Sequence, residues 1–320
     1  MDVAIAILNW NGKNWLEKFL PSVISHSENT DIYIIDNAST DDSVAFLKLN
    51  FPQVKIIQNT ENHGFAGGYN EGLKKIKADI YCLLNSDVEV TENWLNPVVD
   101  LFQKDLNISA VQPKILDFNR KNFFEFAGAA GGFIDNLGYP YCRGRVFENI
   151  EEDKGQYDDE TEIFWASGCC MFIRSEDFWR QNGFDERFFA HQEEIDLCWR
   201  LKNDGKKIFY TGKSTIYHVG GGTLNKQSAQ KTFLNMRNNL TMLVKNLPVS
   251  KVFWIIFTRL ILDGAAALYF AFKNGFPHLW AVLRAHFSFY AQLPKTLQLR
   301  SKNQIRNYYQ SKWLIFKHFI

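Results

Sequence analysis

Three polar residues directly follow a run that is typical of a buried strand, and their types suit metal and phosphate chemistry. The apolar run extends from Ile80 to Leu84, and Asn85, Ser86 and Asp87 come next. In an open α/β sheet, ligands bind just outside the carboxyl ends of the strands, so Asp87 is expected where chemistry would occur. A carboxylate on a rigid support is a good ligand for a divalent cation that holds a diphosphate. An Asx-turn that only ends the strand would give the same pattern.

A pair of carboxylates, Glu193 and Glu194, opens a predicted helix that runs from Glu194 to about residue 204. Neighbouring residues on a helix point about 100° apart, so one carboxylate can face a cleft while the other supports the fold. A carboxylate in a cleft can be the general base that deprotonates a hydroxyl nucleophile. The alternative is an acidic first turn that only stabilises the helix.

His218 ends a strand pattern, and after Val219 come three glycines, at 220–222, whose backbone can bend around a ligand. A histidine that acts with an aspartate favours a transition metal such as Mn²⁺ over Ca²⁺. A lone histidine at the end of a strand is more often structural.

Two further polar loops could contact a ligand. Asp36 follows a buried strand and could accept a hydrogen bond from a base or a ribose. The run from Asp36 to Asp41 is also a good helix N-cap, with Ser39 or Thr40 as the cap. The run 62–68 contains three glycines, which lack Cβ atoms, next to a helix start that favours anions.

The elements that must position these residues alternate along the first hundred residues. Strand patterns occupy 3–8, 31–36, 54–58 and 80–85, and helix patterns follow the first three. Repeated strand–helix units predict an α/β fold with a mostly parallel, doubly wound sheet and polar loops at one edge. The loop 9–13 holds a single glycine and does not match the dinucleotide-binding fingerprint.

Residues 117–162 interrupt this alternation. They are rich in glycine and aromatic residues and then acidic, and a long loop inside a compact domain is usually either functional or disordered. Arg143 and Arg145 in this stretch could close over a diphosphate or could equally be solvated. The domain is expected to be completed by a strand at 163–173, a helix at 175–182, a strand at 206–211 and a segment at 215–222.

Composition excludes a disordered protein, because 46% of the 320 residues are apolar and 22% are charged. The net charge is only +1, but residues 205–320 carry 17 basic side chains and a single acidic one, Asp263. Such asymmetry suggests a basic C-terminal part that meets an anionic partner. The five cysteines follow no zinc-ligand spacing and are expected to be reduced and buried in a cytosolic protein. Because a strand pattern begins at residue 3, no signal peptide is expected.

Apolar helix patterns dominate the C-terminal third. A helix at about 226–246 is followed by residues 252–272, which approach a membrane-spanning length but contain Arg259 and Asp263, and by a second apolar stretch at 276–293. Amphipathic, aromatic and basic helices of this kind favour attachment to the surface of an anionic membrane. A re-entrant or spanning hairpin and soluble helices that pack on a partner are the alternatives. The expected division is a catalytic domain at 1–225 and a helical, basic, membrane-associating region at 226–320.

Six short motifs occur in an order that is highly specific as a set, although none is specific alone. They are Asn9-Trp10-Asn11-Gly12, Asp36 to Asp41, Asn62 to Asn70, Leu84-Asn85-Ser86-Asp87, Glu193 to Arg200, and His218-Val219-Gly220-Gly221. With them, the chain resembles a family 2 glycosyltransferase of the inverting, metal-dependent GT-A class, close to rhamnosyltransferase-like enzymes of polysaccharide synthesis. The resemblance covers about residues 1–240. It implies a bacterial enzyme of cell-envelope polysaccharide synthesis, cytoplasmic and peripheral on the inner face of the membrane.

The resemblance also implies roles for single residues. The nucleotide-diphospho-sugar donor is expected at Asn9, Asn11, Asp36, Asn62, Gly67, Asn85, Ser86 and Asp87. A divalent cation, Mn²⁺ or Mg²⁺, is expected at Asp87 and His218, and the acceptor at Trp165, Ser167 and Gly168. The family's Glu-Asp pair, whose second member is the base, falls on Glu193 and Glu194, so Glu194 is the predicted base and Glu193 the alternative. Two departures matter, because Asn85 stands where the family has the first aspartate of Asp-X-Asp, and Glu194 is one methylene longer than the usual aspartate.

The implied reaction is a single displacement in which a hydroxyl of a glycan or lipid-linked glycan attacks the donor sugar. Alternatives are a polyprenyl-phosphate glycosyltransferase and an inactive membrane-bound scaffold of the same fold. A nucleotidyltransferase on a similar sheet is a third, although such an enzyme typically has a glycine-rich, basic loop after its first strand and the loop 9–13 offers one glycine and one lysine. No nucleic-acid partner is expected.

Overall fold

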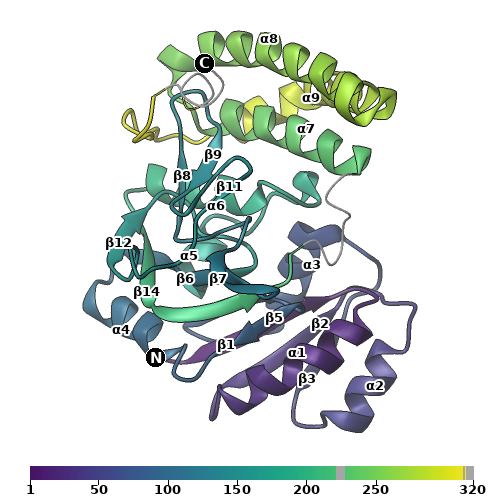
Figure 1. The fold of residues 1–320 in the computed structure, drawn as a ribbon, viewed down its shortest axis with the longest axis vertical. Helices are drawn as coiled ribbons and strands as arrows, with labels where there is room; N and C mark the ends of the chain where they lie inside the picture. The colour runs from purple at the N-terminus through teal and green to yellow at the C-terminus, as the bar shows by residue number, and fades with distance from the viewer. Residues whose placement is uncertain (221–227, 313, 315–320) are drawn as a thin grey trace.

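A computed structural model describes residues 1–220, 228–312 and 314, and a mixed ten-stranded sheet forms its centre (Figure 1). The strand order is β12-β14-β6-β13-β4-β1-β2-β3, with β5 attached to β14 and β7 to β6. These strands are β1 (Val3–Asn9), β2 (Asp31–Asp36), β3 (Lys55–Gln58), β4 (Ile80–Asn85), β5 (Val88–Val90), β6 (Ile108–Asp117), β7 (Arg120–Phe124), β12 (Glu160–Ile163), β13 (Cys170–Arg174) and β14 (Lys207–His218). The neighbours β3, β2, β1 and β4 are parallel, as the repeated strand–helix units predict, whereas β13 runs antiparallel between β4 and β6.

Helices cover both faces of this sheet. They are α1 (Lys13–Ser25), α2 (Ser43–Asn50), α3 (Gly64–Leu73), α4 (Asn96–Lys104), α5 (Ser175–Arg180), the 3-10 helix Glu186–Phe188 and α6 (Glu193–Asn203). Strand β1 alternates its side chains between two cores, because successive residues of a strand face opposite sides. Ile5 and Ile7 belong to the core that contains Leu16 of α1, and Ala4 belongs to the core that contains Tyr69 of α3. The doubly wound arrangement that was predicted is therefore confirmed.

Three predicted elements differ from the structure. The expected strand 163–173 is two strands, β12 and β13, because the chain leaves the sheet between them and the Ser167 amide donates to the Gln112 side chain at 2.8 Å. Most of the segment 206–211 and residues 215–218 belong to one strand, β14, whose pairing with β6 shifts register between Thr211 and Thr215. The stretch 117–162 is ordered and contains β7, the start of β12 and a second small sheet of β8 (Gly132–Ile134), β9 (Pro140–Cys142), β10 (Arg145–Val146) and β11 (Asn149–Ile150).

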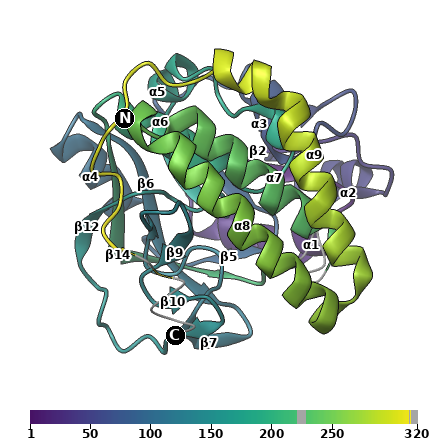
Figure 2. The ribbon, with the colours of Figure 1, turned by 90° about the horizontal axis from the view of Figure 1, so that it is seen from above.

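Three long helices gather at one end of the molecule: α7 (Ala229–Asn246), α8 (Val249–Asn274) and α9 (Phe276–Gln298) (Figure 1). Seen from above, α8 and α9 lie over α7 (Figure 2). Helix α7 begins where the Ser228 hydroxyl accepts a hydrogen bond from the Lys231 amide. The predicted boundary between 225 and 226, and the glycines 221–222, lie outside the described residues. All five cysteines are free and buried, as predicted.

The charges that interrupt the apolar sequence of α8 point into the protein. Arg259 and Asp263 are 2% and 1% exposed. Arg259 donates to the Leu137 carbonyl at 3.0 Å and lies over the ring of Tyr139, and Asp263 approaches both Arg259 and His286 of α9. Among the described residues, α8 is the one helix that is long and apolar enough to cross a membrane. Its outer side is apolar because both charges are turned inward.

Candidate active site

The carboxyl ends of three neighbouring strands bring the predicted donor residues to one edge of the sheet. In the strand register, Asn9 lies opposite Asp36 and Leu8 lies opposite Asn85. Parallel neighbours end at the same edge, so the loops that follow β1, β2 and β4 meet there. This meeting was predicted from the strand patterns alone.

Asn9 and Asp36 form a buried hydrogen-bonded pair. The Asn9 amide group donates to Asp36 Oδ1 and to the Ser39 hydroxyl, each at 3.1 Å, and the Ser39 amide donates to Asp36 Oδ2 at 3.1 Å. Helix α2 begins only at Ser43, so the alternative in which Ser39 or Thr40 caps that helix is wrong. The Asn9 Oδ1 atom is buried and has no hydrogen-bond partner among the residues that the structure describes, so it can accept a hydrogen bond from a ligand.

Asn11 joins the loop after β1 to the loop after β2. Its side-chain oxygen accepts from the amides of Thr40 and Asp41 at 2.7 and 3.2 Å, and its own backbone has φ 51. These hydrogen bonds occupy the side chain of Asn11, which was predicted to contact the nucleotide-sugar donor. The neighbouring Trp10 is 44% exposed and offers an aromatic face at this edge. Sequence reasoning did not single it out, although an aromatic residue at a strand end was a visible signal.

The predicted anion site at the start of α3 is wrong, because backbone and side-chain groups of the protein fill it. The amides of Phe65 and Ala66 donate to the Phe189 carbonyl at 2.7 and 3.2 Å. Asn62 accepts from the Gly64 amide at 2.9 Å. A Cβ atom on Gly67 would lie 2.8 Å from the Cβ of His63, so this glycine is needed for close contact within the protein.

Asn37 and Asn59 organise this loop, and sequence reasoning gave neither a role. The Asn37 amide group donates to the Asn62 side chain and to the Gly64 carbonyl, each at 2.9 Å, and Asn59 donates to Asn37 and to the Gly68 carbonyl, each at 3.1 Å. Asn62 and Gly67 therefore shape the loop beside the edge, and their predicted contact with the donor stays a prediction.

Asp87, His218 and Glu125 form a buried line at the end of β4. Asp87 Oδ1 lies 3.2 Å from His218 Nε2, and His218 Nδ1 lies 3.5 Å from Glu125 Oε1. Burial lowers the pKa of His218, but Cys169, Glu125 and Asp87 outweigh it and hold that pKa well above its usual value. Burial alone would raise the pKa of Asp87, and the charge and hydrogen bond of His218 lower it below its usual value. Glu125 was missed, because only the fold brings residue 125 to residue 218.

The pair Asp87 and His218 fits a divalent cation that is completed by other ligands. An imidazole nitrogen and a carboxylate oxygen share a buried space, and Asn85 Nδ2 lies 3.4 Å from the same His218 Nε2. A carboxylate behind the second histidine nitrogen is the usual support of a metal-binding histidine. The part of the chain that the structure describes contains no group of three His, Cys, Asp or Glu residues that could hold a metal alone. Substrate oxygens and water would therefore supply the remaining ligands.

Glu193 and Glu194 begin α6, and burial changes the acidity of both. Burial raises the pKa of Glu194 to about 7, against hydrogen bonds from nearby backbone amides, and it raises the pKa of Glu193 well above its usual value. Each side chain has a buried Oε2 atom that finds no hydrogen-bond partner in the described part of the chain. A carboxylate with a pKa near neutral pH suits a general base. Burial also favours Glu194, because Glu193 is only 3% exposed whereas Glu194 is partly exposed.

The loop before α6 has an unusual backbone. Phe189, His191 and Gln192 have φ 64, 71 and 75, the left-handed region that non-glycine residues rarely adopt. Each such residue costs on the order of 1–3 kcal/mol, and such strain is concentrated at functional sites. Burial lowers the pKa of His191 to about 4, so this imidazole is neutral. Sequence reasoning missed this loop, since it holds no glycine to signal the conformation.

The predicted acceptor residues separate into two groups. Trp165 is 3% exposed, and its indole nitrogen donates to the Phe133 carbonyl at 2.8 Å. Ser167 is 2% exposed, and its hydroxyl accepts from the Cys169 amide at 3.3 Å. Both are interior residues in this structure, and their predicted contact with an acceptor stays a prediction. A Cβ on Gly168 would lie 3.8 Å from the Cβ of Glu194, so this residue does adjoin the predicted base.

The two loop arginines have partners within the protein. Arg143 forms an ion pair with Asp159 at 2.9 Å and donates to the Ala130 carbonyl, and Arg145 lies over the ring of Phe126. Both arginines are partly buried and contact other groups of the protein, and their closure over a diphosphate stays a prediction.

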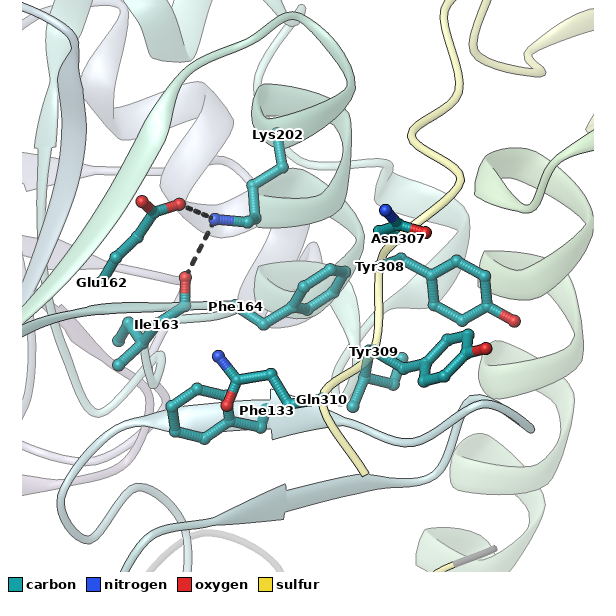
Figure 3. A pocket seen from close by; sticks show the side chains of 10 residues that line it. Phe133, Glu162, Ile163, Phe164, Lys202, Asn307, Tyr308, Tyr309 and Gln310 are labelled. Atoms are coloured by element: carbon teal, nitrogen blue, oxygen red, sulfur yellow. Dashed lines mark hydrogen bonds and ion pairs between the residues drawn. The ribbon is translucent and has the colours of Figure 1, made fainter. Parts of the chain in front are cut away.

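A cavity of about 260 Å³ lies apart from this site (Figure 3). It is bordered by Phe133, Phe164 and the tail residues Tyr308 and Tyr309, and at the end of α6 by Lys202. The Lys202 ammonium already pairs with Glu162 at 2.5 Å. Eight residues of helix separate it from Glu194, a rise of about 12 Å, so the cavity is not part of the candidate active site.

Comparison with known proteins agrees with this geometry. A family model, Glycosyl transferase family 2, matches residues 4–181. An N-acetylglucosaminyl-diphospho-decaprenol L-rhamnosyltransferase of Mycobacterium tuberculosis is 23% identical over 219 residues, which are 63% of this chain and 71% of the relative.

Two solved structures share the fold. One is GalNAc-T7 with UDP, GalNAc and Mn²⁺, which has a TM-score of 0.63 at 18% identity over 78% of this chain and only 49% of its own. The other is residues 1–349 of TarS from S. aureus, with a TM-score of 0.59 at 12% identity over 94% of this chain and 83% of that one. The predicted GT-A fold is confirmed, and because the family model covers more than half of the sequence, the chain belongs to glycosyl transferase family 2.

Proposed function

We propose that this glycosyltransferase moves a sugar from a nucleotide-diphospho-sugar donor to a hydroxyl of a glycan or lipid-linked glycan, by a single displacement that inverts the anomeric carbon. One observation carries the proposal: the strand end that bears Asp87 and the residue Glu194 border the same short segment. The Asn85 amide donates to the Cys169 carbonyl at 2.9 Å, and the adjacent Gly168 approaches Glu194. A diphosphate at Asp87 and an acceptor hydroxyl at Glu194 would thus meet across residues 168–169.

The residues of the chain would act in sequence. Asp36 and the free Asn9 Oδ1 accept hydrogen bonds from the nucleoside, while Asp87 and His218 hold a divalent cation, Mn²⁺ or Mg²⁺, that when bound supplies Lewis-acid stabilisation of the diphosphate. Glu194 in its ionised form accepts the proton of the acceptor hydroxyl. That oxygen attacks the anomeric carbon from the face opposite the diphosphate while the bond from this carbon to the diphosphate oxygen breaks. The nucleoside diphosphate leaves with the electron pair, and the configuration is inverted.

A donor screen tests the proposal directly. UDP-, GDP- and dTDP-sugars are incubated with the protein and Mn²⁺, and binding, hydrolysis and transfer are measured. The mycobacterial relative's name specifies an L-rhamnosyl group and a diphospho-decaprenol-linked acceptor, so an L-rhamnosyl donor is a sensible first choice. Absence of Mn²⁺-dependent binding and turnover with every donor would instead support the inactive scaffold.

Glu125 should support the metal site through His218. Its carboxylate lies 3.5 Å from His218 Nδ1, and the Gly220 backbone, at φ 70, approaches the same carboxylate without a Cβ atom. Glu125→Gln should weaken Mn²⁺ binding about 10- to 100-fold, as loss of such supporting carboxylates typically does. Titration calorimetry without donor measures this. Glu162→Gln, which alters a carboxylate paired with Lys202, is the control, and equal affinities in all three proteins would exclude the role.

The outer side of α8 and α9 is proposed to lie on an anionic membrane at the cytoplasmic face. Its large apolar side chains are exposed, among them Phe253, Trp254, Phe257, Ile261, Phe272, Phe276, Trp280 and Phe287. Exposed basic residues, including Lys273, Arg284 and Lys295, flank them. An apolar side bordered by cations suits the headgroup region of an anionic leaflet. Such a site would place the enzyme beside a lipid-linked acceptor.

Serine substitutions on that side should release the protein from vesicles. The combined variant Trp254→Ser, Phe257→Ser, Phe272→Ser and Trp280→Ser should bind phosphatidylglycerol vesicles at least about 100-fold more weakly, since burial of each large side chain contributes about 2 kcal/mol. Cosedimentation measures the effect. Truncation at residue 248 is a poorer test, because the Ser301 amide and the Ile305 amide donate to Lys245 and Asn203 of the folded core.

The matched control for this variant is Leu49→Ser with Leu106→Ser. These leucines are 82% and 76% exposed but belong to α2 and the turn after α4, away from α8 and α9 (Figure 1). Unchanged binding by the four-serine variant contradicts the proposal. Wild-type protein that resists both high salt and alkaline carbonate would indicate the spanning alternative.

A further inference from the structure

Asn238, near the middle of α7, is directed at the loop that precedes Glu194. Its side-chain nitrogen lies 3.0, 3.0 and 2.8 Å from the backbone oxygens of Phe188, Ala190 and His191. The residue is 1% exposed, so no water competes for these contacts. A carboxamide nitrogen carries two hydrogens, and here both are shared among carbonyls of one short loop.

The loop is held from two opposite directions. The Phe189 carbonyl points away from α7 and accepts from the amides of Phe65 and Ala66 in α3. Carbonyls on either side of it point to Asn238. Successive carbonyls can point in opposite directions here because Phe189, His191 and Gln192 adopt the left-handed conformation described above. The buried Asn238 amide group contacts three carbonyls of the loop and so keeps the loop in that conformation.

Neighbouring residues of α7 reinforce this contact. Arg237 donates to the Phe188 carbonyl at 3.1 Å, and Asn239 donates to the Gln192 side chain at 3.2 Å. At the far end of the helix, the buried Lys245 ammonium pairs with Asp185 at 2.9 Å and with Asp196 of α6 at 2.7 Å. Helix α7 thus contacts the chain before, within and after the loop.

We propose that Asn238 is a positioning residue, which sets the direction of the Glu194 carboxylate through the loop 188–192 and never touches the substrates. The proposal rests on the proposed transferase function for its kinetic consequence. Its structural consequence, a loop held by α7, stands independently. An error of about 1 Å in a reacting group can reduce a rate about 100-fold, so loss of this contact should act on turnover and not on donor binding.

The test compares Asn238→Ala and the isosteric Asn238→Asp with Asn235→Ala. Asn235 is on the same helix, and among the described residues its side chain donates to the Lys231 carbonyl of that helix, at 3.0 Å. Both Asn238 variants should lower kcat about 10- to 100-fold, leave the donor KM and the Mn²⁺-dependent donor Kd within about threefold, and accelerate amide hydrogen exchange at 188–194. Asn235→Ala should change none of these.

Unchanged kcat and unchanged exchange at 188–194 in both Asn238 variants would overturn the proposal. The proposal would also be overturned if both Asn238 variants lost donor affinity and lost exchange protection throughout the protein, because general unfolding has that result. If the wild-type protein transferred no sugar, the proposed function would fail, while the exchange measurement would still decide whether Asn238 holds the loop. Asn238→Asp covers the case in which Asn238→Ala does not fold, because aspartate fills the same space and lacks the donor.

Discussion

Glu194→Gln is expected to reduce kcat about 10²- to 10⁴-fold, the usual contribution of a general base. Glutamine keeps the shape of the side chain and cannot accept the acceptor's proton. Donor affinity should hardly change, because residues 168–169 lie between Glu194 and Asp87, and Asp87 is the residue proposed to hold the metal and the diphosphate. The measurement is steady-state transfer, with donor binding measured by calorimetry. A variant that kept full turnover would exclude Glu194 as the base.

The wild-type rate should rise with pH and level off above about 7. Burial raises the pKa of Glu194 to about 7, so below that pH the carboxyl is mostly protonated and cannot serve as a base. The logarithm of kcat should therefore increase by about one per pH unit on the acid side. Glu193→Gln supplies the comparison, since Glu193 carries the alternative assignment. If Glu193→Gln lost turnover and Glu194→Gln did not, the base would be Glu193.

Asp87→Asn should remove most of the metal-dependent donor binding. The amide has no negative charge for a divalent cation, and His218 would remain with only Glu125 as a carboxylate neighbour. Loss of about 3 kcal/mol of electrostatic stabilisation corresponds to a decrease of about 100-fold in Mn²⁺-dependent donor affinity and in kcat/KM. Asn85 in place of an aspartate should make the effect larger, because no second carboxylate is adjacent in the sequence.

Asp117→Asn is the matched control for Asp87→Asn. Asp117 lies opposite His218 in the register of β6 and β14, but its carboxylate pairs with Arg120 at 3.2 Å near the surface. Its loss should leave Mn²⁺ and donor affinity unchanged. Equal donor affinity in Asp87→Asn and wild type, measured with and without Mn²⁺, would contradict a metal role for Asp87.

The parts of the site that depend on one strand end were predictable from the sequence. An apolar run followed by Asn85 and Asp87 is a local pattern, and parallel strands bring such ends together by geometry that any α/β sheet shares. The fold class followed from the same repetition. Glu194 was assigned through the order of several motifs, and its burial adds a physical reason for that assignment.

Features that depend on distant segments were not predictable. The resemblance implies a place on the acceptor side for Trp165, and only the small sheet formed by 132–150 shows that its ring fills an interior space beside Gly132. The start of α3 reads as an anion site, and only the Phe189 carbonyl, more than a hundred residues later, occupies its amides. Asn238 reads as an ordinary helix residue. In each case the deciding contact joins residues that are far apart in the sequence, and a local hydrophobic period does not predict such a contact.

The hydrogen bonds that join Asn9 and Asn11 to the loop 36–41 also bear on how the nucleotide would be recognised. Those loops reach their final arrangement when the chain folds, so little conformational entropy remains to be lost when a ligand arrives. A rigid surface discriminates among nucleosides by shape and by the few donors and acceptors it presents, and adapts poorly to a wrong one. The loops that would bind the nucleotide should therefore select one nucleoside. Donors that the enzyme accepts should differ in their sugar and share the nucleotide.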